Sequence, residues 1–159
     1  GHHAGRVMAG GGLGLVAAST FAVAESGAKL GTPEIDVGLF PMMIMAVLSR
    51  LVPRRALLDM MLLGKKLTAA EAHAIGIVNE VAAAADLDAA VKRTADAIAA
   101  KSPITIRLGL RAFAQQDDMD LASALPMLRT KLAECLSTDD AREGLMAFME
   151  KRPPVWKGR

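Results

Sequence analysis

The stretch GTPEIDVGLFP, residues 31–41, places Glu34 directly after Pro33, between Gly31 and Gly38, with apolar residues on both sides. Because proline fixes one backbone angle and glycine permits sharp reversals, this pattern predicts a stiff turn that faces an apolar surface. A carboxylate in such surroundings can serve as a general acid or base. The alternative is an ordinary turn glutamate in solvent. The choice between them depends on the rest of the chain.

The composition of the 159-residue chain indicates one domain with an apolar core, alone or with a helical extension. Hydrophobic residues make up 52% of the chain, which is enough to build that core from aliphatic side chains and methionine. The 19 basic residues nearly balance the 17 acidic ones, so no basic surface is expected. This argues against nucleic acid as a partner.

The single cysteine, Cys135, excludes an internal disulfide framework and a cysteine-based metal cluster. We therefore expect a reducing compartment, a cytoplasmic location and no metal site. Charged residues such as Arg50 and Asp59 interrupt the most apolar region, which leaves no run of the roughly 20 apolar residues that span a bilayer. We expect no membrane partner, and the first residues lack the layout of a signal peptide.

The beginning of the chain predicts a strand at residues 7–9, a turn at Gly10, Gly11 and Gly12, and a helix at residues 13–19. In this arrangement the free N–H groups of the helix's first turn face the end of the strand, which favours a negatively charged oxygen. One interpretation is an oxyanion hole, in which a backbone N–H beside Gly11 or Gly12 stabilises a carbonyl oxygen that gains charge.

A second interpretation of the same turn is a dinucleotide site. Gly12, Gly14 and Ala17 match the pattern G-x-G-x-x-G/A, and Glu34 follows at the distance of a ribose-binding acid. The match is incomplete, because that acid should end the next parallel strand, whereas Glu34 follows a turn.

The rest of the chain predicts short strands and helices up to about Ala82 and helices alone after it. We therefore divide the chain into residues 1–81 and residues 82–159. The expected strands are at residues 21–25, 29–30 and 77–81. The expected helices are a buried one at residues 42–51, then residues 54–63, 68–76 with a capping box, 86–101, 104–116, 119–136 and 141–151.

Four motifs in order resemble the enoyl-CoA hydratase/isomerase family, the crotonase superfamily. They are AGGGLGL at residues 9–15, GTPEIDVGLFP at 31–41, LTAAEAHAIGIVNEV at 67–81 and EGLMAFMEKRPPVWKG at 143–158. The resemblance covers nearly the whole chain, but only about the C-terminal half of a typical member. It implies an α/β fold, in which the C-terminal portion of a ββα spiral is followed by an all-helical trimerisation region, and a homotrimer or hexamer.

The resemblance also implies an acyl-CoA thioester as substrate and no cofactor beyond the coenzyme A of that substrate. Gly11 falls where the family has its second oxyanion-hole N–H, and Glu34 falls on the glutamate of its Pro-Glu motif. By the same resemblance the last helix lies over the acyl or pantetheine part of the ligand. The expected substrate-binding residues are Gly10, Gly12, Pro33, Leu39, Met42, Phe148 and Lys151.

One departure from the family bears on the reaction type. Typical hydratases carry a second catalytic glutamate at the position of Gly14. One carboxylate accounts more simply for proton transfer between two carbon atoms than for hydration. The resemblance therefore favours a double-bond isomerase, unless Asp36 or another residue takes the place of the second glutamate. Two other hypotheses are a catalytically incompetent chain that serves as an oligomerisation module, and a dinucleotide-binding fragment.

Overall fold

The computed structural model describes residues 7–9 and 11–159. The chain forms two compact units, which divide between Arg93 and Thr94, and each is described by itself. The change in composition near Ala82 precedes this division. The roles assigned to residues 1–81 and 82–159 stay predictions.

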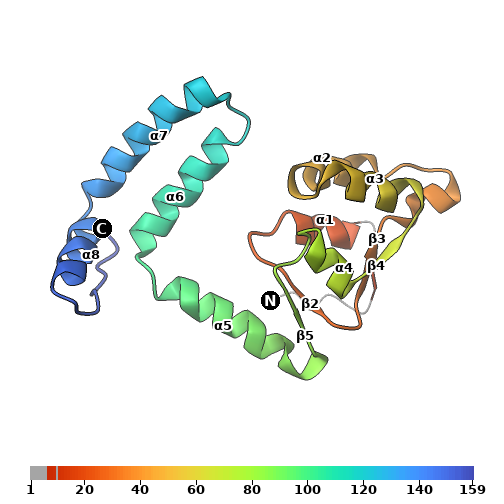
Figure 1. Ribbon diagram of the computed structural model, residues 1–159, viewed down its shortest axis with the longest axis horizontal. Coiled ribbons are helices and arrows are strands. Elements are labelled where there is room, and N and C mark those ends of the chain that lie inside the picture. The colour runs from red at the N-terminus through yellow and green to blue at the C-terminus, as the bar shows by residue number, and fades with distance from the viewer. Residues whose placement is uncertain (1–6, 10) are drawn as a thin grey trace. The chain divides into compact units, whose positions relative to one another are not determined.

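The first unit combines short strands with helices (Figure 1). Three strands form one sheet in the order β1-β3-β4, and β2 pairs with β5 in a second, parallel sheet. The elements are β1 (Val7–Ala9), α1 (Gly11–Ala17), β2 (Val23–Glu25), β3 (Lys29–Gly31), the 3₁₀ helix η1 (Pro33–Val37), α2 (Met42–Leu51), α3 (Arg54–Leu62), β4 (Lys66–Thr68), α4 (Ala69–Ala74), β5 (Glu80–Ala82), the 3₁₀ helix η2 (Ala84–Asp86) and α5 (Leu87–Ala99), whose end lies in the second unit.

The register of the three-stranded sheet sets two loops next to each other. Strands β1 and β3 are parallel, with Ala9 opposite Gly31, so their carboxyl ends lie at the same edge. Helix α1 begins at Gly11, just past the end of β1, and η1 begins at Pro33, just past the end of β3. The sheet therefore brings the glycine turn and the Glu34 turn together.

The core of the first unit is built from side chains of α1, β3, α2 and α3. The largest fully buried ones are Leu13, Leu30, Leu48, Met60 and Met61. Burial of each contributes roughly 1.5–3 kcal/mol before the entropy of ordering is subtracted. These contacts fix α1, which follows β1, and β3, which leads into the Glu34 turn.

The expectation of a buried helix at residues 42–51 was wrong for one face. Helix α2 buries Ile44 and Leu48, whereas Met42 and Met43 are exposed, Met43 to 86%. Apolar sequence alone does not show which face of a helix meets the core, because the partners of that face lie elsewhere in the chain.

Strand β4 was not predicted, and β5 begins at Glu80, later than the predicted residue 77. Leu67 of β4 pairs with Leu30 of β3, which is a contact between distant parts of the chain. The capping box at Thr68 is confirmed, because its hydroxyl accepts the N–H of Glu71 while the Glu71 carboxylate accepts the N–H of Thr68. Local rules found the cap and missed the strand that precedes it.

The second unit is helical in all its regular structure. Helices α6 (Pro103–Gln116) and α7 (Leu121–Leu136) run side by side in opposite directions, and α8 (Asp139–Met149) packs on both (Figure 1). Ser102, Asp120 and Thr138 cap these helices with side-chain oxygens. No helix in the described part of the chain is long and apolar enough to cross a membrane.

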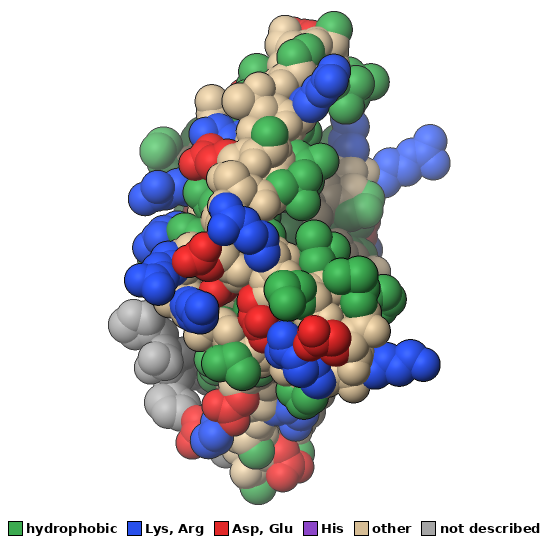
Figure 2. Space-filling view, turned by 90° about the vertical axis from the view of Figure 1, so that its left-hand side faces the viewer, with side chains coloured by type: hydrophobic (Ala, Val, Ile, Leu, Met, Phe, Trp, Pro, Cys, Tyr) green, Lys and Arg blue, Asp and Glu red, His purple; other side chains and the backbone are tan. Residues whose placement is uncertain are grey.

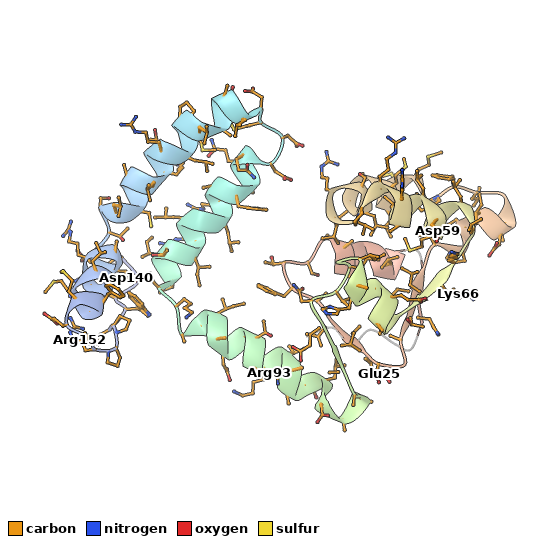
Figure 3. All side chains as sticks on the ribbon, in the orientation of Figure 1. Glu25, Asp59, Lys66, Arg93, Asp140 and Arg152 are labelled. Carbon is orange, nitrogen blue, oxygen red and sulfur yellow. The ribbon has the colours of Figure 1, made fainter. Side chains whose placement is uncertain are left out.

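The last residues of the chain are held within the second unit by polar contacts, several of them to Asp140, which Figure 3 labels. Asp140, only 1% exposed, accepts hydrogen bonds from the Ser102 hydroxyl at 2.7 Å and from the backbone N–H groups of Lys157 and Gly158 at 2.7 and 3.1 Å. Burial raises the pKa of Asp140, but these donors lower it by more. Trp156 donates its Nε1–H to the carbonyl of Ala100 at 2.9 Å.

Candidate active site

Glu34 lies on η1, the 3₁₀ helix that the turn motif forms. Pro33 occupies the first turn of this helix, and Gly38 ends it in the left-handed conformation at φ 78°. The predicted stiff turn is therefore a short helix with glycine at its end. The Glu34 side chain is half-buried, and its Oε2 atom is buried without a hydrogen-bond partner among the described residues. Such an oxygen calls for an explanation, because leaving it unpaired is costly.

A largely apolar pocket of about 520 Å³ contains Glu34. Two of the expected substrate-binding residues, Leu39 and Met42, also line it, and both side chains are 62% exposed. The other lining residues are Gly14, Phe40, Pro41, Met43, Ile44 and Val47. One carboxylate thus faces a hollow of aliphatic, aromatic and thioether groups.

Gly11 is the first residue of α1, earlier than the helix start predicted at residue 13. Its backbone N–H belongs to the first turn, whose donors have no partner inside the helix. Gly12 also lies in that turn, whereas Gly10 lies outside the described residues. The register of β1 and β3 brings this helix start to the same sheet edge as the Glu34 turn.

The geometry of α1 does not match the dinucleotide interpretation. Gly12, Gly14 and Ala17 all lie inside the helix, whereas the dinucleotide pattern needs its first glycine in the turn before the helix. Glu34 lies on η1 and does not end a strand. The same turn remains suited to a single oxygen atom.

Gly14 occupies the position at which the resemblance led us to look for a second catalytic glutamate. It lines the pocket together with Glu34, and a Cβ atom added there would meet only the Ile44 side chain, at 3.8 Å. Asp36, the suggested substitute, is exposed, does not line the pocket and lies against Gly64 instead. Its placement favours a structural role in the turn.

The remaining expected residues are divided between the two units. Pro33 is half-buried next to Glu34 but does not line the pocket. Phe148 and Lys151 belong to the second unit, where Phe148 is 84% exposed on α8 and Lys151 follows this helix with φ 53°. Among the described residues no group of three or more His, Cys, Asp or Glu side chains could hold a metal ion.

Sequence reasoning missed Thr32, Phe40 and Ile44. Thr32 is fully buried next to Pro33, and its hydroxyl has no hydrogen-bond partner in the described part of the chain. Phe40 and Ile44 line the pocket. No spacing rule singles out these side chains, since their roles depend on which elements pack around them.

Comparison with known proteins gives the family. Residues 4–159 match the family described as enoyl-CoA hydratase/isomerase. The chain belongs to the enoyl-CoA hydratase/isomerase family. Among its relatives, the human enoyl-CoA hydratase domain-containing protein 3, mitochondrial, is 35% identical over 150 residues, which are 94% of this chain and 50% of that protein. A carnitinyl-CoA dehydratase of Escherichia coli is 31% identical over 155 residues, which are 94% of this chain and 59% of that enzyme.

Solved structures of the family show the same fold. The crystal structure of the human domain-containing protein 3 matches with a TM-score of 0.88 and 34% identity, over 94% of this chain and 59% of that one. An enoyl-CoA hydratase of Mycobacterium smegmatis matches with a TM-score of 0.91 and 34% identity, over 94% of this chain and 58% of that one. The chain therefore has a crotonase-like α/β fold and spans about half the length of the curated relatives it matches.

Proposed function

We propose that this chain carries the acid–base half of an acyl-CoA enzyme of the enoyl-CoA hydratase/isomerase type. The observation that carries this proposal is the Glu34 carboxylate, which faces an apolar pocket with a buried, unpartnered oxygen. A group that exchanges protons with a substrate carbon needs a free carboxylate oxygen in a place from which water is largely excluded. Family membership supplies the acyl-CoA thioester as the substrate class.

In the proposed mechanism the thioester carbonyl oxygen accepts the N–H of Gly11, and Glu34 removes a proton from the carbon next to the thioester. The electron pair of that C–H bond then delocalises onto the carbonyl oxygen as an enolate, which the N–H stabilises. Glu34 returns the proton to a carbon further along the chain, so the double bond moves and Glu34 is regenerated. Leu39 and Met42 contact the acyl chain, while Gly12 and Pro33 shape the backbone around the thioester.

Isomerisation is the reaction that one carboxylate supports best. Hydration in this scheme needs one group to activate water and another to donate a proton, and Gly14 supplies neither. We therefore propose enoyl-CoA isomerisation as the activity, with hydration as the alternative within the same family. Phe148 and Lys151 are proposed to contact the acyl or pantetheine part of the ligand, and a homotrimer or hexamer is the proposed assembly.

Paired assays test this function. The chain is incubated with a 3-enoyl-CoA and with crotonyl-CoA, and double-bond migration and hydration are followed separately. The variant Glu34→Gln should lose most turnover, on the order of 10²-fold or more, while CoA-ester binding survives. Asp36→Asn is the matched control, because it removes a carboxylate from the same 3₁₀ helix outside the pocket. Equal turnover in the Glu34→Gln variant removes Glu34 from the mechanism.

A second candidate function is an oligomerisation module without activity of its own. Large apolar side chains are exposed along the second unit, as expected of helices that pack against other chains. Figure 2 shows hydrophobic side chains exposed between charged ones on one face of the molecule. The exposed large apolar side chains of α6 and α7 are Leu110, Phe113, Leu121, Leu125, Leu132 and Leu136. Sedimentation that finds an oligomer, together with no turnover of either substrate, supports this candidate.

A further inference from the structure

The turn between α3 and β4 lies against Gly31, which precedes Glu34, and against the Ile35 and Asp36 side chains, which follow it. This turn contains Gly64 and Lys65, and Figure 3 labels Asp59 and Lys66 on the two elements that it joins. Helix α3 contacts η1, and β4 pairs with β3, the strand that leads into η1. The turn is therefore well placed to determine where η1 sits.

The first close approach is at Gly31. A Cβ atom added to this residue would lie 2.7 Å from the backbone carbonyl oxygen of Lys65, which is too close for two such atoms. Because the Lys65 oxygen is a backbone atom, rotation of a side chain cannot relieve this clash. Glycine is needed here for space, since close backbone approach excludes any side chain.

The connection from Gly31 to Glu34 has little freedom to absorb a shift. Thr32 is 0% exposed, and Pro33 has a restricted backbone angle. A displacement of Gly31 is therefore passed on to Glu34.

The second close approach is at Gly64, against side chains of η1. An added Cβ atom would lie 2.9 Å from Asp36 Oδ1 and 3.1 Å from Ile35 Cγ2. Gly64 has φ 59° and follows α3, where the N–H of Lys65 bonds to the carbonyl of Met60 at 3.1 Å. This is a common helix ending that by itself favours glycine, so the contact with η1 has to be separated from the backbone preference.

We propose that Gly31 and Gly64 are positioning residues for Glu34, with the α3–β4 turn as the support on which η1 rests. The proposal builds on the acid–base role proposed for Glu34. Gly31 acts by allowing the backbone of Lys65 to approach closely, and Gly64 acts by leaving room for the Asp36 and Ile35 side chains. Neither glycine is proposed to touch the substrate. A shift of the Glu34 carboxylate by a fraction of an ångström to an ångström lowers the rate of proton transfer, since such transfer depends steeply on geometry.

Two pairs of matched variants separate positioning from folding. Gly31→Ala is compared with Gly109→Ala, where an added Cβ has open space. Gly64→Asn is compared with Gly76→Asn, because Gly76 ends α4 in the same way with φ 86° and its nearest neighbour would be 3.8 Å from the added Cβ. Asparagine tolerates the left-handed conformation, so the second pair differs mainly in the contact with η1.

The first measurement is independent of catalysis. In the isotopically labelled chain, Gly31→Ala and Gly64→Asn should shift the Glu34 amide and carboxyl resonances, whereas Gly109→Ala and Gly76→Asn should leave them in place. Unchanged Glu34 resonances in both test variants overturn the proposal, whatever the chain's activity. The Gly64→Asn variant keeps this test valid if Gly31→Ala does not fold.

The second measurement is a double-mutant cycle on turnover. Each test variant should lower kcat about tenfold to 10²-fold with KM little changed. In the Glu34→Gln background the same substitutions should have no further effect, because the group they position is gone. An equal loss in both backgrounds contradicts positioning through Glu34. Full activity of Glu34→Gln itself contradicts the proposed function and leaves the resonance test to decide the positioning.

Discussion

Gly14 of α1 and Glu34 of η1 line the same pocket, and Glu34 is the only carboxylate among its described lining residues, so a second acid–base group, which hydration in the proposed scheme requires, is missing from it. The missing group can be restored, because an added Cβ at Gly14 meets only the Ile44 side chain at an ordinary contact distance of 3.8 Å. The reaction type is therefore open to a direct test by substitution.

The variant Gly14→Glu should gain hydration activity relative to Gly14→Gln. Both place a side chain of the same size in the pocket, but only glutamate adds an acid–base group. A well-placed second group contributes about 10²-fold or more to the rate. The measurement is the loss of the conjugated enoyl thioester of crotonyl-CoA, together with double-bond migration in a 3-enoyl-CoA. Equal hydration rates for the two variants contradict the explanation based on Gly14.

Truncation of Met42 should reduce turnover of long acyl chains with little loss of stability. Its side chain is largely exposed in the pocket, so Met42→Ala is expected to change the free energy of unfolding by only about 0.5 kcal/mol. Each methylene group that no longer packs against the acyl chain should lower kcat/KM about fourfold. Urea unfolding and a series of acyl-CoA lengths measure the two effects.

Ile44→Ala and Leu62→Ala are the controls for Met42. Ile44 lines the same pocket but is only 9% exposed, so its truncation should cost about 2–4 kcal/mol of stability. Leu62 is exposed outside the pocket, so its truncation should change neither property. A decrease in long-chain turnover in Leu62→Ala as large as in Met42→Ala contradicts an acyl-binding role for Met42.

The second unit should lose stability in acid through Glu143. The Arg152 guanidinium, which binds both carboxylate oxygens at 2.6 and 3.1 Å, and the N–H of Val155 lower the pKa of Glu143 from 4.5 to about 2. The unfolded chain therefore binds the proton first as pH falls. The stabilisation is complete above pH 4.5 and is lost as pH falls towards about 2.

The variant Glu143→Gln isolates this contribution. It should be less stable than the parent chain at neutral pH, and its stability should fall less steeply between pH 4.5 and about 2. Urea unfolding at a series of pH values gives both slopes. The contribution of Glu143 is the difference between the two slopes, because Asp140 also has a lowered pKa and contributes to the acid sensitivity of the parent chain. Equal slopes argue against the Glu143–Arg152 pair as the cause.

Replacement of Lys151 by glycine should stabilise the chain and weaken ligand binding. Lys151 has φ 53°, and the N–H of Arg152 bonds to the carbonyl of Ala147 at 3.0 Å, a helix ending at which glycine is usual. Relief of the left-handed conformation is worth about 1 kcal/mol. Loss of the ammonium group removes the ligand contact proposed for Lys151.

Lys151→Ala separates the two effects of that substitution, since alanine keeps the backbone strain and removes the ammonium group. Both variants should bind an acyl-CoA more weakly, with a smaller salt dependence, while only Lys151→Gly gains stability. Calorimetry measures binding, and thermal unfolding measures stability. Unchanged affinity in both variants shows that Lys151 does not contact the ligand.

Local sequence rules predicted most of the helices, because caps and breakers act within a few residues. Thr68 with Glu71 forms the predicted capping box, and Ser102 and Thr138 cap α6 and α8 through side-chain oxygens in the same local way. The exposure of Met42 and the existence of β4 were not predictable in this way. Both depend on which distant segment packs against them.

The sequence by itself determined the family, the Pro33-Glu34 pair in a turn and the glycine at position 14, since these follow from residue identity and order. The tertiary structure decided that β1 and β3 pair in parallel with Ala9 opposite Gly31, which brings the Gly11 and Glu34 turns to one edge. It also decided that Gly14 shares a pocket with the segment that carries Glu34, while Asp36 lies against Gly64. These relations arise from backbone pairing and packing between segments far apart in the chain, for which no local pattern carries a signal.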